Sequence, residues 1–450
     1  MKKKSIVVVL ILLLAQSLVN SQSKVNDIFP FPILQTKLPN GLNVVTVPYN
    51  SPGIVSLYIV IRAGSHEEVE PGKTGFAHFF EHMMFRGTEK YTPDQYNEVL
   101  NSLGASANAN TSSDRTMFYM TGNATMLDKM FELEGDRFQH LKYSVHDFKT
   151  EAGAVKGEYT KNAASPFSQL QEKISNTAYD KSTYKHTTMG FFKDVVDMPN
   201  QYDYSLTFFQ RFYRPEYATI IVVGDVKQPT VLQYAQKYFG SWKRGNYKPV
   251  IEQDPMQTGT RFTHIKLGSF PPYLSMNYKG PGFSYTDKDL PSLTLLCSLM
   301  FGETSPLYQK LVLKERKVRT LFANAGLNRD PGLISIGASV VDSKDLQYVK
   351  DEIVKILELA KVEGVDARRL SDTKSNYKYS IAMRLDSPDA LAEALGRFTW
   401  LSGKPETINA YYALFNKTTA QDLILVAKKY FTPEALTIGT ISPDEEVGVK

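Results

Sequence analysis

The sequence predicts an α+β protein with two homologous layered domains, each a mostly antiparallel sheet packed with helices. The chain has 450 residues, of which 42% are hydrophobic and 22% charged, so it is long enough to bury more than one core. Strand-like and helix-like segments are mixed without strict alternation, which favours a layered α+β domain over a parallel doubly wound one. The two halves of the chain also resemble each other.

This internal repeat is visible when the two halves are aligned. GFAHFFEHMMFRG at 75–87 corresponds to PSLTLLCSLMFG at 291–302, and each follows an alternating strand-like segment, at 55–62 and at 273–278. The halves also close alike, with YRPEYATIIVV and FTPEALTIGT, at offsets of about 216–218 residues. We therefore assign residues 30–245 to an N-terminal domain, 246–260 to a linker and 261–447 to a related C-terminal domain.

The first 21 residues are typical of a secretory signal peptide. Three lysines at positions 2–4 precede an apolar run from Ile6 to Leu14, and Val19 and Ser21 fit a small-residue cleavage site. The run is shorter than the roughly 20 residues that span a bilayer, so we expect no lasting membrane span. Cleavage removes three lysines and lowers the formal net charge from +5 to +2, which argues against nucleic acid as a partner. We expect an exported, periplasmic protein.

The segment from Thr74 to Gly87 predicts one helix, with Thr74 as the N-cap residue and Gly87 just past the end. His78 and His82 are four residues apart, so both imidazoles share one helix face at a spacing that suits two zinc ligands. Glu81 borders the same pocket but cannot easily be a third ligand from the same turn. The order His-x-x-Glu-His is the inverted form of a zinc-protease motif.

The third ligand is expected on a later helix, which is predicted to begin at Ser144 with Asp147 as its capping-box partner. Glu151 and Glu158 on that helix are seven residues apart and share a face. From the residues alone, either carboxylate could bind the metal. The other would then accept a hydrogen bond from a ligating histidine and fix its tautomer.

A structural role for these residues is the alternative interpretation. A single histidine on an apolar helix is usually a hydrogen-bonded core residue, and a pair of glutamates seven apart is usually a solvated face. Here two histidines and a glutamate lie within an otherwise apolar segment, where burying an unpaired carboxylate costs several kcal/mol. We therefore favour a metal site.

HFFEHMMFRGT, followed by FKTEAGAVKGEY, closely resembles the pitrilysin/insulinase family of zinc peptidases. The resemblance implies an exported bacterial half-length catalytic subunit that holds one zinc ion per chain. It implies that Glu158, 76 positions after His82, is the third ligand, and that Glu151 is needed for activity without contacting the metal. It also implies that Asn108 and Ala109 lie on an edge strand and bind the substrate backbone.

These observations predict a zinc metalloendopeptidase that hydrolyses peptides or unfolded polypeptides, with Glu81 as the catalytic base. The N-terminal domain would hold the zinc. A non-catalytic structural or peptide-binding member of the same family is the alternative. A presequence-processing peptidase is a further alternative, which the signal peptide disfavours.

The second domain is predicted to lack a metal site, because Thr294, Cys297 and Ser298 stand where the motif stands in the first half. The resemblance implies that such a domain supplies an arginine and a tyrosine, seven residues apart, that hold the substrate and the developing oxyanion. Leu313 and Thr320 occupy these positions in the stretch LKERKVRT. A misalignment is possible here, since this stretch holds two other arginines. We otherwise expect a heterodimer with a sister subunit that lacks the zinc motif and supplies the arginine and tyrosine.

Overall fold

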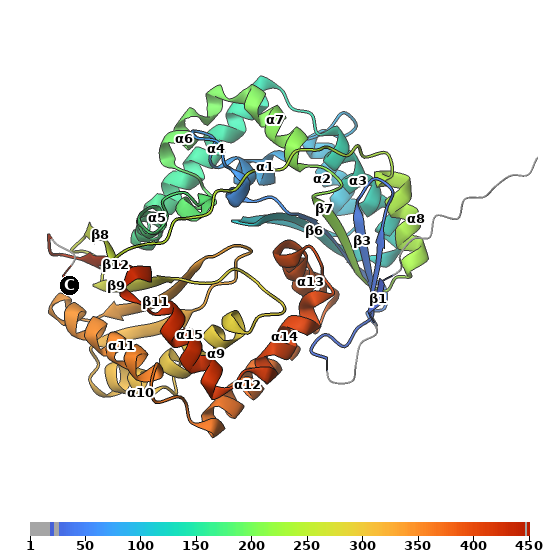
Figure 1. The fold of residues 1–450 in the computed structure, drawn as a ribbon. Helices are drawn as coiled ribbons and strands as arrows, with labels where there is room; N and C mark the ends of the chain where they lie inside the picture. Colours follow the sequence, from blue (N-terminus) through green and yellow to red (C-terminus); the bar gives the residue numbers. More distant parts are fainter. Residues whose placement is uncertain (1–18, 22–26, 446–447) are drawn as a thin grey trace, which may run out of the picture.

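The computed structural model describes residues 19–21, 27–445 and 448–450 and confirms the predicted α+β architecture. Each half of the chain forms one sheet packed with helices (Figure 1). The predicted signal peptide lies outside the described residues, except for Val19–Ser21, which forms the short strand β1. No helix of the described segments combines the length and the apolar character needed to cross a membrane.

The first sheet has seven strands in the order β1-β2-β3-β7-β4-β6-β5. The β3–β7 pair is parallel, and the other neighbouring strands are antiparallel. β5 is the last strand in the order, so no described strand pairs with its outer edge. The strands after β1 are β2 (Ile33–Lys37), β3 (Asn43–Pro48), β4 (Ile54–Ile61), β5 (Ser106–Ser112), β6 (Arg115–Asn123) and β7 (Ala218–Gly224).

The second sheet repeats the topology of the first. Its order is β10-β11-β9-β12-β8, with β12 and β8 parallel and the other neighbours antiparallel. Taken in reverse, this order matches β3-β7-β4-β6-β5 strand for strand, including the position of the parallel pair. The repeat seen in the sequence is therefore a repeat of structure. The strands are β8 (Arg261–Lys266), β9 (Tyr273–Lys279), β10 (Val318–Asn324), β11 (Leu333–Val340) and β12 (Leu436–Ser442).

The helices of the two halves follow a similar order. The first half has α1 (Phe76–Met83), α2 (Pro93–Ser102), α3 (Leu127–His140), α4 (Val145–Ala163), α5 (Pro166–Ala178), α6 (Phe192–Asp197), α7 (Tyr202–Phe212) and α8 (Gln228–Phe239). The second half has α9 (Asp289–Phe301), α10 (Pro306–Tyr308), α11 (Leu346–Ala360), α12 (Ala367–Ala382), α13 (Pro388–Ser402), α14 (Thr407–Lys417) and α15 (Ala420–Tyr430). Short helical turns are η1 (Ser65–Glu67), η2 (Ala124–Met126), η3 (Thr183–Lys185), η4 (Met198–Asn200), η5 (Gln309–Lys314), η6 (Ser343–Asp345) and η7 (Pro433–Ala435).

The two domains exchange one helix each across their interface. Helix α5 of the first domain packs on β12 and β8 of the second sheet, and α13 of the second domain packs on β4 and β7 of the first (Figure 1). Gly439 on β12 permits the close approach of α5, because a Cβ atom there would lie 2.7 Å from the side chain of Ile174. The inner face of the first sheet and the core of the second domain consequently form one apolar cluster.

A buried ion pair also joins the domains. Arg329, in the loop between β10 and β11, lies 2.7 Å from the carboxylate of Glu67 in the first domain. Its backbone N–H donates to Asp114 at 2.9 Å, and the hydroxyl of Tyr184 donates to the other oxygen of Asp114 at 2.7 Å. Burial raises the pKa of Glu67, and the guanidinium of Arg329 opposes this shift. Such a pair is costly to break, because loss of one partner leaves an uncompensated buried charge.

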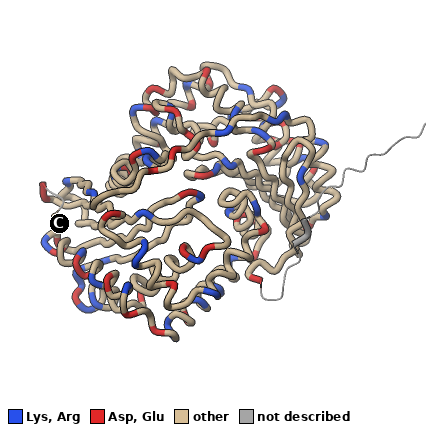
Figure 2. The backbone as a smooth tube through the Cα atoms, viewed as in Figure 1, with Lys and Arg blue, Asp and Glu red and all other residues tan. Residues whose placement is uncertain are grey.

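Charged residues of both signs are interspersed along the backbone of both domains (Figure 2). This distribution accords with the small formal net charge of +5 over the whole chain.

Candidate metal centre

Helix α1 begins one residue later than predicted and ends at Met83, before the predicted end at Gly87. Its start depends on the buried carboxylate of Glu68. Thr74 does not cap the helix, because its hydroxyl donates to Asp194 at 2.7 Å. The N-cap is Gly75, whose φ of 94° is accessible to glycine at little cost. Glu68 accepts the N–H of Gly75 at 2.8 Å and that of Ala77 at 2.7 Å. Burial raises the pKa of Glu68 to about 8, while these two N–H donors lower it.

One face of α1 is held by aromatic packing. Phe79 packs edge-on against Phe148 of α4, with ring centroids 5.1 Å apart, and Phe80 stacks on Phe208 of α7 at 5.4 Å. Both phenylalanines of α1 are fully buried. These contacts set the position of α1 relative to α4, and they leave the face that carries the motif turned toward α4.

Helix α4 presents two carboxylates to this face. It begins at Ser144, whose side chain accepts the N–H of Asp147 at 3.1 Å while Asp147 accepts the N–H of Ser144, as predicted for a capping box. Glu151 and Glu158 lie two turns apart on the same side of α4, and both contact histidines of α1. The structure thus brings together residues that are separated by more than 60 positions in the chain.

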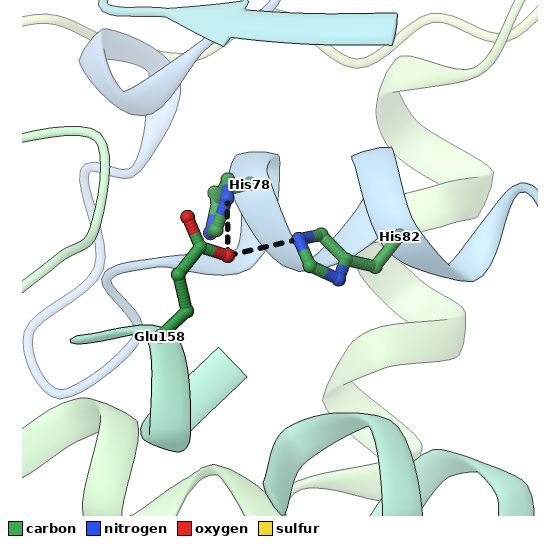
Figure 3. A group of neighbouring side chains, drawn as sticks. All are labelled: His78, His82 and Glu158. Atoms are coloured by element: carbon green, nitrogen blue, oxygen red, sulfur yellow. Dashed lines mark ion pairs between the residues drawn. The ribbon is translucent and has the colours of Figure 1, made fainter. Parts of the chain in front are cut away.

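His78, His82 and Glu158 form a compact group of potential metal ligands (Figure 3). Glu158 Oε2 lies 3.5 Å from His78 Nε2 and 3.3 Å from His82 Nε2, and the three ligand atoms all lie within 4.8 Å of one another. Two atoms bound at about 2.05 Å to a tetrahedral ion are about 3.3 Å apart, close to the two distances from Glu158 Oε2 to the histidines. Within the described segments no other histidine, cysteine or carboxylate group clusters in this way. The residues fit a zinc ion.

Glu151 contacts the ring nitrogen of His82 that faces away from the ligand atoms. Its Oε1 lies 2.9 Å from His82 Nδ1, and its other oxygen pairs with Arg86. A carboxylate accepts here, so the Nδ1–H group of His82 donates to Glu151, and Nε2, which faces Glu158, is left to bind a metal. Although burial raises the pKa of Glu151, the hydrogen bonds from His82 and Arg86 outweigh it and lower that pKa below its usual range. The bond with Glu151 raises the pKa of His82, whereas burial lowers the pKa of His78.

Glu81 lies beside the ligand group and is held by a residue that the sequence analysis did not single out. Thr111 on β5 donates its hydroxyl to Glu81 Oε2 at 2.6 Å. Side chains on a strand alternate between faces, so Thr111 shares the face of Ala109, which is buried. If β5 is expected to pack beside the motif helix, this alternation predicts that Thr111 faces the helix together with Ala109.

The predicted substrate-binding pair lies on the last strand of the first sheet. Asn108 is exposed, and Ala109 is 7% exposed. The N–H of Ala109 donates to the side-chain oxygen of Asn108 at 2.8 Å. This hydrogen bond holds the side chain of Asn108 along β5, where a peptide that paired with the edge of the strand would lie.

Comparison with known proteins places the chain in a family. A model described as insulinase (peptidase family M16) matches residues 44–190, and a model of the peptidase M16 inactive domain matches residues 201–377. The chain belongs to peptidase family M16. Zinc protease PqqE of Helicobacter pylori is 28% identical to this M16 chain over 413 residues, covering 90% of this chain and 92% of that protein.

Solved structures support the same conclusion. The crystal structure of a protease from Helicobacter pylori matches 91% of this M16 chain and 99% of that chain, with a TM-score of 0.83 and 27% identity. The periplasmic protease PqqL from Escherichia coli has the same fold at 20% identity and a TM-score of 0.73, and the match covers 92% of this chain but 48% of that one. This M16 chain therefore has a half-length M16 fold.

In the second domain of this M16 chain, other residues stand where the first domain has the His-x-x-Glu-His motif. Thr294, Cys297 and Ser298 lie on α9 and line a pocket of about 490 Å³ together with Thr320. Thr320 is exposed on β10, and Leu313, in η5, is 52% exposed. None of these side chains is a usual zinc ligand except the thiol of Cys297, whose pKa burial raises to about 12.

Proposed function

We propose that this chain is a zinc-dependent endopeptidase that holds one zinc ion through His78, His82 and Glu158. The convergence of two imidazole nitrogens and one carboxylate oxygen beside Glu81 is the observation that carries this proposal. Three protein ligands with an open fourth position are typical of a catalytic zinc site rather than a structural one. The relatives that are named zinc proteases support the assignment.

Each residue of the site has a distinct part in the proposed reaction. When bound, a zinc ion supplies a Lewis acid that lowers the pKa of water and polarises a peptide carbonyl. Glu81 accepts the proton of the attacking water and then donates it to the leaving amine. Thr111 holds one oxygen of Glu81 and leaves the other free to receive the proton. Glu151 keeps His82 in the tautomer that presents Nε2.

We propose that β5 binds the substrate as an added strand. The strand β5 lies next to Glu81, because Thr111 contacts that residue, and no described strand pairs with its outer edge. Pairing requires a free, extended backbone, so the substrates would be peptides or unfolded polypeptides rather than folded proteins.

Unfolded substrates are therefore expected to be cleaved much faster than folded ones. The test uses a single disulfide-bonded protein in two forms, native and reduced with alkylated cysteines, so that the sequence offered is the same. Electrophoresis and mass spectrometry should show cleavage of the unfolded form, while the native form survives. Rapid cleavage within the native form would contradict strand pairing on β5.

We also propose that the mature protein is exported to the periplasm. Residues 1–21 have the features of a signal peptide, and the related PqqL is described as periplasmic. Mass spectrometry of the protein isolated from a periplasmic extract would test this, since a chain that begins after residue 21 is expected.

We further propose that this chain is the zinc-bearing subunit of a heterodimer. Leu313 and Thr320 stand where an arginine and a tyrosine are expected, and the fold spans about half of the PqqL chain. A sister subunit of similar size, without the zinc motif, would supply the two missing donors. Donors aimed at a developing oxyanion are typically worth about 10²- to 10³-fold in rate each.

Peptide hydrolysis is accordingly expected to rise by at least about 10²-fold when a sister subunit is added to this chain. The measurement compares kcat for one peptide with this chain alone, with the sister alone and with the mixture. A sister variant whose arginine is replaced by alanine provides the matched control. Full activity of this chain as a monomer or homodimer would rule the heterodimer out.

A further inference from the structure

A pocket of about 470 Å³ lies where the first domain meets the second sheet. Helices α4 and α5 form one side of it, and strands β9, β10 and β11 form the other. Phe167, Leu170, Met189, Tyr273 and Phe322 provide most of its apolar lining. Pockets between domains are common ligand sites, because neither domain alone fills the space.

The pocket lies next to the candidate metal centre. Asn162 lines the pocket, and it follows Glu158 by four residues on α4. Four residues of helix correspond to about 6 Å along the axis, so the two sites are neighbours on one rigid element. An extended peptide advances about 3.3 Å per residue, and a peptide held at the metal centre would therefore reach the pocket within a few residues.

The chemistry of the lining favours an uncharged, apolar occupant. Glu172 is the one acidic or basic residue of the lining, and its carboxylate already accepts a hydrogen bond from the hydroxyl of Tyr159 at 2.6 Å. Ser335 on the sheet side donates its hydroxyl to Asn277 at 2.8 Å. An acidic side chain entering the pocket would lose its water and meet the like charge of Glu172. A basic side chain would lose its water for one carboxylate that is already bonded to Tyr159.

Two phenylalanine rings stand at the pocket with large exposed areas. Phe167 is 47% exposed and Phe322 is 49% exposed. Phe167 is held edge-on against Tyr273 with ring centroids 4.8 Å apart. The ring of Phe322 lies against Gly337 of β11, where a Cβ atom would come within 2.5 Å of the ring. Both rings are thus positioned before any ligand is present, which lowers the entropic cost of binding.

We propose that this pocket, here called the Phe167–Phe322 pocket, binds a large apolar side chain of the substrate. It would set a preference for an aromatic or long aliphatic residue within a few positions of the cleaved bond. The inference rests on the proposed function, because it takes the occupant to be a peptide held at the metal centre.

The test measures binding rather than hydrolysis, so that it does not depend on catalysis. Fluorescein-labelled peptides of alanine, serine and glycine would carry a single variable residue, either Phe, Leu, Ala, Asp or Arg, at each position in turn. Affinity for the Glu81→Gln protein would be followed by fluorescence anisotropy. At one position, Phe is expected to bind about 10- to 100-fold more tightly than Ala, with Leu close to Phe.

Variants of the pocket are expected to remove this difference. Phe167→Ala combined with Phe322→Ala should reduce the Phe-to-Ala ratio to near one, and both positions are exposed enough for the fold to tolerate truncation. Ser168→Trp adds bulk at an exposed lining position and should have the same effect. Phe262→Ala on β8 is the matched control, because Phe262 is 42% exposed and lies outside the pocket lining.

The outcomes separate the inference from the proposed function. A preference for Phe that the pocket variants abolish would support the inference that the pocket binds an apolar side chain. If the parental protein showed this preference but hydrolysed no peptide, only the proposed enzyme activity would be wrong. A preference for Arg or Asp would overturn the inference. So would the absence of a Phe preference, or one that survives in the pocket variants.

Discussion

Glu81→Gln is expected to lower kcat for peptide hydrolysis by about 10²- to 10⁴-fold while the zinc content stays at that of the parental protein. The amide keeps the shape of the side chain and can still accept the hydrogen bond from Thr111, which lies 2.6 Å from the carboxylate. It cannot accept the proton of the attacking water, however. Steady-state kinetics and metal analysis of the same preparation would measure both quantities.

Glu98→Gln provides the control for this substitution, because Glu98 is an exposed residue of α2 and is not part of the motif. It should leave kcat and zinc content unchanged. If Glu81→Gln hydrolysed peptides at close to the parental rate, Glu81 would not be the base. A parental protein that binds zinc and peptide but does not hydrolyse peptides would instead favour the non-catalytic, peptide-binding alternative.

The second large effect concerns the metal itself. His78→Ala, His82→Ala and Glu158→Ala should each reduce zinc from about one ion per chain to a small fraction, because two remaining ligands hold the ion poorly. Glu151→Ala should have a smaller effect, of about 10- to 100-fold in affinity, since Glu151 contacts Nδ1 of His82 and is not itself one of the three proposed ligands. Metal analysis after dialysis against a weak chelator would rank these variants.

His140→Ala is the matched control for the ligand variants, because His140 is an exposed histidine at the end of α3. Circular dichroism would show whether each variant keeps the fold. Full zinc occupancy in all three ligand variants would exclude this group as the metal site.

Local sequence patterns predicted those features that depend on neighbouring residues. The capping box of Ser144 and Asp147 was predicted correctly, because it joins side chains and backbone groups only three residues apart. The shared face of His78 and His82 follows from the period of the helix. The repeat predicted two related sheets, since each half carries its own alternating strands.

Thr74 shows where this reasoning fails. A threonine before an apolar helix favours an N-cap, yet Thr74 bonds to Asp194, which lies 120 residues away, and Glu68 accepts the helix N–H groups. The distant Asp194 thus takes the hydroxyl of Thr74, and Glu68, just before the helix, satisfies the donors that a threonine cap would have satisfied. The periodicity of one segment contains no information about such a partner.

The sequence by itself determined the strands and helices, the repeat and the pairs of residues that share a face of α1 or α4, because each depends on backbone periods within one segment. The choice between Glu151 and Glu158 was open from the residues alone, and only the tertiary structure shows that Glu158 lies beside both histidines. The bond from Thr111 to Glu81, the exchange of α5 and α13, and the Phe167–Phe322 pocket likewise exist only in the folded chain. Each joins segments far apart in sequence, and their meeting is decided by how the apolar faces of whole elements pack together.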